Sequence, residues 1–455
     1  MVMKSSFKYA KHDFENDLRG YGHFEAGKYW TNYMNHMIYA FQEFPKDRLV
    51  NARTQVDLSL QLNYCHELVL VHRKWFDDNN IDRNDISKLR KDNKEIDYNA
   101  SQITFGKRLL EAIQDLLKGL SWRFYDYDRS FLSTVNIIPP AGYPDRSPGM
   151  IREYEYVLGL SHDHNCQALL FNSIIHSFNL GDVSVLNKDG LIEIWEIKSS
   201  KGGRGRQMAD RIERQKIRML DHERLYNERE SIIDGEHMYI VDSDIEINSD
   251  LKKNMKLIES EVYNKGYCVS NVSEHVVLFA VDLMHDSDDD LVSKSYDEAF
   301  EVAKGLWPRN DRVILSDIVK ILSSNNPNTP PISIWPASPR FIADILAKRV
   351  IISCYINVNK IIERVKRVAN DIVDVAMLNI SQEDDIREVM SGPSARIVYK
   401  SNIIDIPWVE WSRLAYEFVD IESYVESLLQ LLTHSNQLSE KKLMISFSKE
   451  GLIWS

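Results

Sequence analysis

The sequence predicts an α/β core that is flanked by two mostly α-helical regions. Two observations lead to this prediction: apolar residues recur at three- and four-residue spacing in the first third of the chain, and β-rich runs alternate with helical patterns in its middle. Strands that alternate with helices indicate a layered α/β structure. Because 455 residues exceed the roughly 100–200 that one domain usually holds, two or three domains are expected.

The first region, residues 1–149, is predicted to be mostly helical. Leu and Val follow helical spacing in residues 56–75, and the stretch 105–120 has one apolar face, which is formed by Leu109, Leu110, Ile113, Leu116 and Leu117. A proline-rich tract, residues 139–149, then breaks any regular element. We place the first domain boundary in this tract.

The second region, residues 150–285, is predicted to be the α/β core. Its expected elements are, in order, a helix over 166–178, strands over 183–186 and 191–197, a helix over 207–229, a strand over 238–241, a helix over 250–265 and a strand over 276–281. The acidic tract 285–290 is expected to be a linker. The third region, residues 291–455, is predicted to be mostly helical again.

The chemistry of the chain is concentrated in one segment, residues 181–198. Turn-forming residues between two β-rich runs predict a β-hairpin there. If the turn has three residues, Asn187 pairs with Leu191, and counting outward sets Asp182 directly opposite Glu196. Cross-strand partners share a face, with Cβ atoms about 5 Å apart. The two carboxylates are therefore expected to lie side by side.

Lys198 is expected to join them, because alternate residues of a strand point to the same face. An exposed carboxylate–lysine pair would be an ordinary surface ion pair, worth less than about 1 kcal/mol. Here, however, the strand carries apolar residues on both faces, namely Ile192, Ile194, Trp195 and Ile197. Buried charges need a partner, and paired carboxylates suit a hard divalent cation such as Mg²⁺. We therefore predict a metal site at which Asp182, Glu196 and Lys198 are the catalytic residues.

Asp182, followed after the hairpin by Glu196-Ile197-Lys198, resembles the signature of the PD-(D/E)XK, or restriction-endonuclease-like, nuclease superfamily. The resemblance covers residues 150–284 and implies a restriction-endonuclease-like core with a mixed sheet. It implies that Asp182, Glu196 and the backbone carbonyl of Ile197 bind Mg²⁺, with Mn²⁺ as a substitute. It also implies that Lys198 serves the attacking water.

Two positions depart from the pattern of this superfamily. Such folds often have a glutamate on the helix before the hairpin, whereas the predicted helix over 166–178 contains no acid. Glu153 and Glu155 lie further upstream, and Glu155 is taken as a third metal ligand; the alternative is that both are ordinary exposed helix residues. The second departure is Gly181, which stands where proline is common in the superfamily.

The segment after the hairpin, residues 198–229, is basic. It contains ten Lys and Arg residues against five acids, a balance of +5 in a chain of net charge −12. A basic loop and helix that leave the catalytic strand are where a nucleic-acid backbone is expected to lie. The predicted phosphate contacts are Lys201, Arg204, Arg206, Arg211 and Arg214. The alternative is a solvated helix with ion pairs four residues apart, such as Asp210–Arg214. The resemblance further implies a helix glutamine beside the active site, for which Gln207 and Gln215 are the candidates.

These patterns predict a magnesium-dependent nuclease that hydrolyses phosphodiester bonds, with DNA as the substrate and endonucleolytic cleavage as the reaction. A role in bacterial restriction or antiphage defence follows only by analogy with such nucleases. The alternatives are a catalytically silent nucleic-acid-binding module with the same fold, and an assembly subunit in which the helical flanks do the main work. Through those flanks, a homodimer or a protein partner is expected.

The sequence also predicts the compartment. No run approaches the roughly 18 apolar residues of a membrane span, and the first residues lack the apolar segment of a secretory signal. Four cysteines lie far apart, so neither a zinc ribbon nor a disulfide framework is expected. A cytoplasmic protein without a membrane partner is therefore expected.

Overall fold

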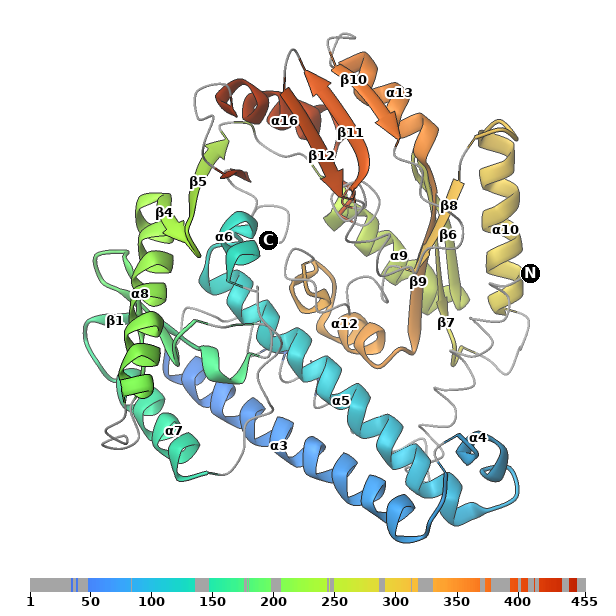
Figure 1. The fold of residues 1–455 in the computed structure, drawn as a ribbon. Helices are drawn as coiled ribbons and strands as arrows, with labels where there is room; N and C mark the ends of the chain where they lie inside the picture. The colour runs from blue at the N-terminus through green and yellow to red at the C-terminus, as the bar shows by residue number, and fades with distance from the viewer. Residues whose placement is uncertain are drawn as a thin grey trace.

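The computed structural model of the protein describes most of its 455 residues. The described residues are 34–35, 38–39, 48–82, 84–135, 147–175, 178, 180–197, 206–243, 245, 249–285, 291–311, 313–317, 330–368, 373–377, 393–399, 402–407, 413, 417–435 and 442–447. These described residues form helices and four small sheets, an α+β arrangement (Figure 1). Among the described helices, none has the length and apolar character that crossing a membrane requires.

Two long helices dominate the N-terminal part. Helices α3 (Arg48–Asp78) and α5 (Lys94–Phe124) pack side by side, with the short α4 (Ile86–Leu89) between them in the chain and α6 (Arg129–Thr134) after them (Figure 1). Asn93 is the N-cap of α5, and its side chain accepts hydrogen bonds from the backbone amides of Glu95 and Ile96. The apolar positions predicted for 105–120 lie within α5, and most of them are buried.

The first sheet is antiparallel, in the order β1-β2-β3, and follows helix α7 (Pro148–Leu160). Its strands are β1 (Cys166–Phe171), β2 (Val183–Asn187) and β3 (Ile192–Trp195). The predicted helix over 166–178 is therefore wrong: residues 166–174 form β1 and a 3-10 turn, η1 (Asn172–Ile174). The error has a physical cause, because β1 is buried almost throughout and its apolar run has no two-residue alternation to mark it as a strand.

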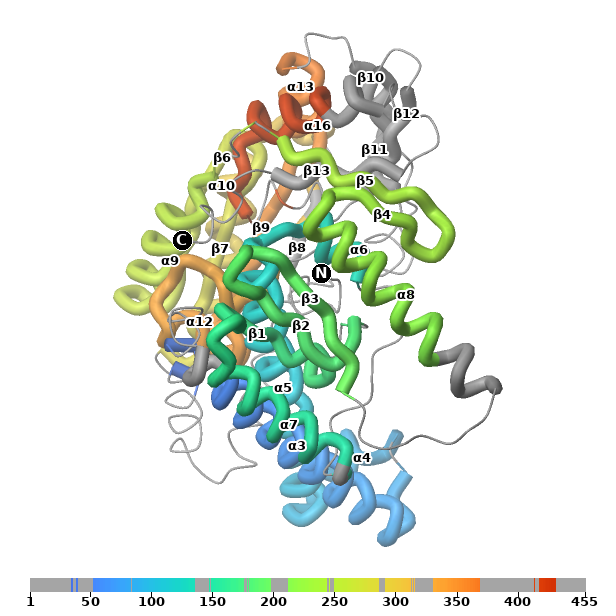
Figure 2. Tube along the Cα trace, turned by 90° about the vertical axis from the view of Figure 1, so that its left-hand side faces the viewer, coloured from blue at the N-terminus to red at the C-terminus, as the bar shows by residue number. Residues whose placement is uncertain are grey.

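Helix side chains satisfy both edges of this sheet. On the β1 edge, the buried side chain of Gln55 donates to the carbonyl of Leu169 (3.1 Å) and accepts from the amide of Phe171 (2.7 Å). On the β3 edge, the amides of Ile192 and Ile194 donate to side chains of helix α8 (Arg206–Glu228), which lies beside β3 (Figure 2). Edge strands need such cover, since unpaired backbone groups are costly when buried.

The two sheets that follow α8 draw strands from distant parts of the chain. The β13-β5-β4 sheet is mixed: β4 (Glu230–Ile233) is antiparallel to β5 (Glu236–Ser243), and β13 (Lys442–Phe447) is parallel to it. The β6-β7-β9-β8 sheet is antiparallel and consists of β6 (Tyr267–Ser273), β7 (Val276–Asp282), β9 (Val350–Asn357) and β8 (Val313–Asp317).

Helices cover both faces of the β6-β7-β9-β8 sheet. Helix α9 (Leu251–Lys265) packs on one face and α10 (Leu291–Leu306) on the other (Figure 1). The remaining elements are η2 (Ile332–Ile334), α12 (Pro339–Leu346), α13 (Val358–Val368), α16 (Ile421–Ser435) and an antiparallel sheet of β10 (Val373–Met377), β11 (Pro393–Tyr399) and β12 (Asn402–Pro407).

The C-terminal region differs from its prediction as a mostly helical region. In its described residues, 291–455 contains six strands, β8 to β13, in addition to its helices. Strand β9 is buried along its whole length, so its apolar residues show no periodicity that separates a strand from a buried helix. The sheets also cross the predicted domain limits, because β7 pairs with β9 and β5 pairs with β13.

Candidate functional site

The β2–β3 hairpin has the predicted register. Its pairs run from Leu186 and Ile192 to Val183 and Trp195, and the amide of Asn187 donates to the carbonyl of Leu191 (3.0 Å). The turn consists of three residues and ends at Gly190, which has a φ of +80°. Glycine adopts this left-handed conformation without steric cost. The prediction of a three-residue turn is therefore confirmed.

Asp182 and Glu196 are the next residues outward at the open end of this hairpin. They follow directly on the last described pair, Val183 and Trp195, and their pairing with each other stays a prediction. The ladder shifts there, because the amide of Asp182 donates to the carbonyl of Trp195 (2.8 Å). Irregularities of this kind re-aim side chains at the ends of strands.

Gly181 allows the backbone before Asp182 to lie close to its neighbours. A Cβ atom at this position would lie 2.7 Å from the sulfur of Met219 and 2.8 Å from the carbonyl oxygen of Trp195. Real Cβ atoms do not approach other heavy atoms so closely, so the packing between α8 and the hairpin requires glycine here.

Hydrogen bonds fix the half-buried carboxylate of Asp182 from two sides. Oδ2 accepts from the backbone amide of Ile197 (2.5 Å), and Oδ1 accepts from the hydroxyl of Ser173 (3.1 Å). The carbonyl of Asp182 accepts from the amides of Asn172 (2.9 Å) and Ser173 (3.3 Å). Burial raises the pKa of Asp182, whereas the hydrogen bonds from Ile197 and Ser173 lower it. The side chain is thus held in one place between η1 and the end of β3.

A buried polar network lies below the turn that carries Ser173. The amide group of Asn172 donates to the hydroxyl of Ser184 (2.8 Å), which also hydrogen-bonds to the hydroxyl of Tyr125 (2.7 Å). Burial raises the pKa of Tyr125, so its hydroxyl stays protonated at neutral pH. This network connects α5, η1 and β2 behind Asp182.

The other predicted residues of the hairpin are described in part. Glu196 and Ile197 follow β3 and are half-buried. Lys198 lies outside the described residues, and so do Lys201 and Arg204. The structure thus brings Asp182 into contact with Ile197, next to Glu196 in the chain, and leaves the position of the lysine as a prediction.

One face of α8 follows β3 toward the open end of the hairpin. Asn227 bonds to Ile192 (3.0 Å), and Glu223, one turn earlier, accepts from the amide of Ile194 (2.5 Å). Gln215 lies two further turns along the same face and is half-buried. Because four helix residues advance about 6 Å, nearly the length of two strand residues, we expect Gln215 to lie past the end of β3.

The remaining predicted residues of α8 are placed less fully. Gln207, Arg206 and Arg211 lie in the first turns of α8, and their side chains are outside the described part. Arg214 is exposed on this helix, as a phosphate contact would have to be. The basic character of the segment is reduced at its end, since Arg229 bonds to Asp128 (2.5 Å) and Asp242 (2.6 Å).

Glu155 does not complete a three-acid site. The helix before the first sheet is α7 and not residues 166–178, so Glu153 and Glu155 do lie on the preceding helix. Glu155 is exposed. Among the described residues, no three His, Cys, Asp or Glu side chains come together to hold a metal ion. The prediction of Glu155 as a third ligand beside Asp182 and Glu196 is therefore not supported.

Sequence reasoning missed Ser173, Glu223 and Asn227. Ser173 was hidden in the wrongly predicted helix, and no local signal connects it with Asp182. Glu223 and Asn227 were detectable in principle, because together with Met219 they recur every four residues on one face of a helix that was predicted correctly.

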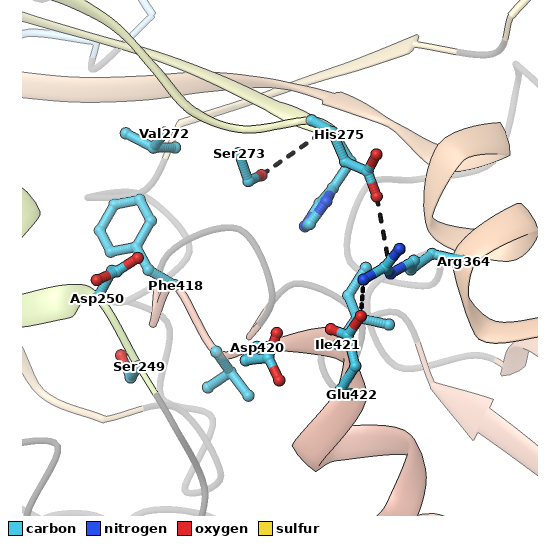
Figure 3. Close-up of a pocket in the computed structure, with 12 residues that line it drawn as sticks. Ser249, Asp250, Val272, Ser273, His275, Arg364, Phe418, Asp420, Ile421 and Glu422 are labelled. Carbon is cyan, nitrogen blue, oxygen red and sulfur yellow. Dashed lines mark hydrogen bonds and ion pairs between the residues drawn. The ribbon is translucent and has the colours of Figure 1, made fainter. Parts of the chain in front are cut away.

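A separate cavity of about 510 Å³ lies between the β6–β7 turn, α13 and the starts of α9 and α16 (Figure 3). Its wall carries Asp250, Asp420 and an ion-pair group in which Arg364 contacts Glu274 (3.9 Å) and Glu422. Of the predicted site residues that the structure describes, none lines this cavity.

No family model, no curated protein and no solved structure matches this chain.

Proposed function

We propose that the protein is a metal-dependent nuclease of the PD-(D/E)XK type that hydrolyses phosphodiester bonds in nucleic acid, with DNA as the substrate. One observation supports this proposal above all: the carboxylate of Asp182 is fixed at the open end of a hairpin by the amide of Ile197, the residue that follows Glu196 in the chain. The strand pairing as far as Val183 and Trp195 agrees with the one counted from the sequence. A role in restriction or antiphage defence stays a prediction by analogy.

The donor atoms at this site suit magnesium. Asp182 and Glu196 offer carboxylate oxygens and Ile197 a backbone carbonyl, and hard divalent cations prefer such oxygen ligands. Each carboxylate oxygen of Asp182 accepts one described hydrogen bond and has a second lone pair for a cation. A bound Mg²⁺ would supply charge stabilisation at the phosphodiester and acidify a water molecule.

The residues of the chain have distinct parts in this proposal. Asp182 and Glu196 hold the cation, and hydrogen bonds keep Asp182 in place before substrate arrives. Lys198 is assigned to the attacking water, as the resemblance implies. Arg214, exposed on α8, is assigned to a phosphate of the backbone on either side of the cleaved bond. Gln215 lies on the α8 face that runs toward this site.

A second candidate function is a nucleic-acid-binding module that does not cleave. It is favoured by the finding that the described residues contain no group of three metal-binding side chains. Two carboxylates without a third acid can hold Mg²⁺ when substrate phosphate adds further ligands. Both candidate proteins bind nucleic acid, but only the nuclease cleaves it.

Cleavage assays on variants of the three predicted catalytic residues separate these functions. Supercoiled plasmid, linear duplex, single-stranded DNA and RNA are incubated with Mg²⁺ or with chelator. The variants are Asp182→Asn, Glu196→Gln and Lys198→Ala, and the control is Asp189→Asn, which removes the same charge from the exposed turn at the far end of the hairpin.

The nuclease proposal predicts metal-dependent cutting by the wild type and the control. It predicts losses in the three site variants on the order of 100-fold or more, because each removes a group that acts on the reacting atoms. Equal cutting by Asp182→Asn and wild type would contradict the proposal. Binding of DNA by all five proteins without cutting would support the non-cleaving module instead.

A further inference from the structure

We propose that Ser173 is a positioning residue of this site, whose hydroxyl sets the plane of the Asp182 carboxylate for metal binding. The inference rests on the proposed function and adds a residue that belongs to neither the hairpin nor its sequence motif. Ser173 lies in η1, the turn after β1, nine residues before Asp182.

The contacts of Ser173 hold Asp182 at two points. The hydroxyl donates to Oδ1 (3.1 Å), and the amide of Ser173 donates to the carbonyl of Asp182 (3.3 Å). The terminal torsion of an aspartate is broad, so a single bond from Ile197 to Oδ2 would leave the carboxylate free to turn about its axis. The second bond, on the other oxygen, removes this freedom.

The turn that carries Ser173 is itself well anchored. The side chain of Asn172 is buried and donates to the hydroxyl of Ser184 (2.8 Å). The backbone amide of Asn172 donates to the carbonyl of Asp182 (2.9 Å). The carbonyl of Ile174 accepts from the side chain of Gln114 on α5 (3.4 Å). Side chains that orient metal ligands act in this way from a rigid support.

A pair of variants of equal shape tests the hydroxyl. Ser173→Thr keeps the hydroxyl and adds a methyl group, whereas Ser173→Val has the same shape without it; Ser173→Ala serves if the larger side chains disturb folding. The control is Thr104→Val, which removes a hydroxyl bonded to a backbone carbonyl within α5. Thermal unfolding of each full-length variant shows that it is folded.

The first measurement is Mn²⁺ affinity by titration calorimetry and by the loss of the free-ion electron paramagnetic resonance signal. We expect Ser173→Val and Ser173→Ala to weaken Mn²⁺ binding on the order of 10- to 100-fold. Ser173→Thr and the control Thr104→Val should bind Mn²⁺ as the wild type does. The second measurement is cleavage at saturating Mg²⁺. In this assay kcat should fall in Ser173→Val and Ser173→Ala and match the wild type in Ser173→Thr, with the KM for DNA unchanged.

The outcomes are distinguishable. If the wild type binds Mn²⁺ and cleaves DNA but Ser173→Val does both equally well, the role of Ser173 is refuted and the proposed function stands. If Thr loses as much affinity as Val, the effect belongs to side-chain shape and the inference is again refuted. If the wild type neither binds Mn²⁺ nor cleaves, the proposed function fails, and the inference fails with it.

Discussion

Replacing Gly181 by alanine should destabilise the protein and impair the site together. The new Cβ would lie 2.7 Å from the sulfur of Met219, 2.8 Å from the carbonyl oxygen of Trp195 and 3.0 Å from Cγ2 of Ile194. Methionine can move aside, but the Trp195 carbonyl accepts the hydrogen bond from the amide of Asp182 (2.8 Å) and would have to break it to retreat. Overpacking costs about 1–3 kcal/mol and the lost bond about 1 kcal/mol, so we expect a loss of about 2–4 kcal/mol.

Urea denaturation followed by tryptophan fluorescence measures this loss, with plasmid cleavage measured in parallel. Gly159→Ala is the matched control: Gly159 lies in α7, a Cβ there meets nothing within 4 Å, and alanine should stabilise the helix by up to about 1 kcal/mol. Adding Met219→Ala to Gly181→Ala should recover only the part of the lost stability that is due to contact with the Met219 sulfur. A Gly181→Ala protein as stable and as active as the wild type would refute this interpretation of the close approach.

Three further predictions concern stability. Gln55→Leu should cost about 2–4 kcal/mol, because it leaves the carbonyl of Leu169 and the amide of Phe171 unpaired in a buried edge; an unchanged urea midpoint would contradict this. Asp182→Asn should be more stable than the wild type near pH 7. Burial raises the pKa of Asp182 in the folded state, so the ionised carboxylate weakens folding above that pKa, and the gain should vanish as the pH falls below about 4, the ordinary pKa of an aspartate. A gain in stability that does not depend on pH would contradict the raised pKa of Asp182. Arg218→Met should be neutral or stabilising by about 1 kcal/mol in thermal unfolding, because Nε and Nη2 of Arg218 are buried with no hydrogen-bond partner among the described residues; a loss above about 1 kcal/mol would show that the guanidinium contributes to the fold.

The hairpin could be predicted because its determinants are local. Asn187 uses its side chain to accept from the amides of Asp189 and Leu191 (3.0 Å each), and Gly190 adopts the left-handed conformation that the turn requires. Once the turn length is known, the register from Leu186 and Ile192 to Val183 and Trp195 follows by counting.

Strands β1 and β9 could not be predicted in the same way. Both are buried on both faces, so their apolar residues carry no period, and what makes them strands lies elsewhere in the chain. For β1 the deciding partners are β2 on one side and the side chain of Gln55 on the other. For β9 they are β7 and β8, which lie before and after a predicted domain limit.

Ser173 shows why the motif alone gives an incomplete site. Its contact with Asp182 depends on η1 turning back toward β2, and this turn exists only because β1 is a strand that ends at Phe171. A wrong element assignment therefore removed a site residue as well as a piece of the fold. Arg229 shows the reverse error, since its contribution to the basic tract is taken up by Asp128 and Asp242.

Anomalous scattering from crystals of the full chain grown with Mn²⁺ would locate the cation itself. Oxygen ligands from both Asp182 and Glu196 within about 2.0–2.3 Å of an anomalous peak are the predicted result. A map at saturating Mn²⁺ with no peak between these two carboxylates, or with the carboxylates turned away from each other, would contradict a metal-dependent nuclease at this hairpin.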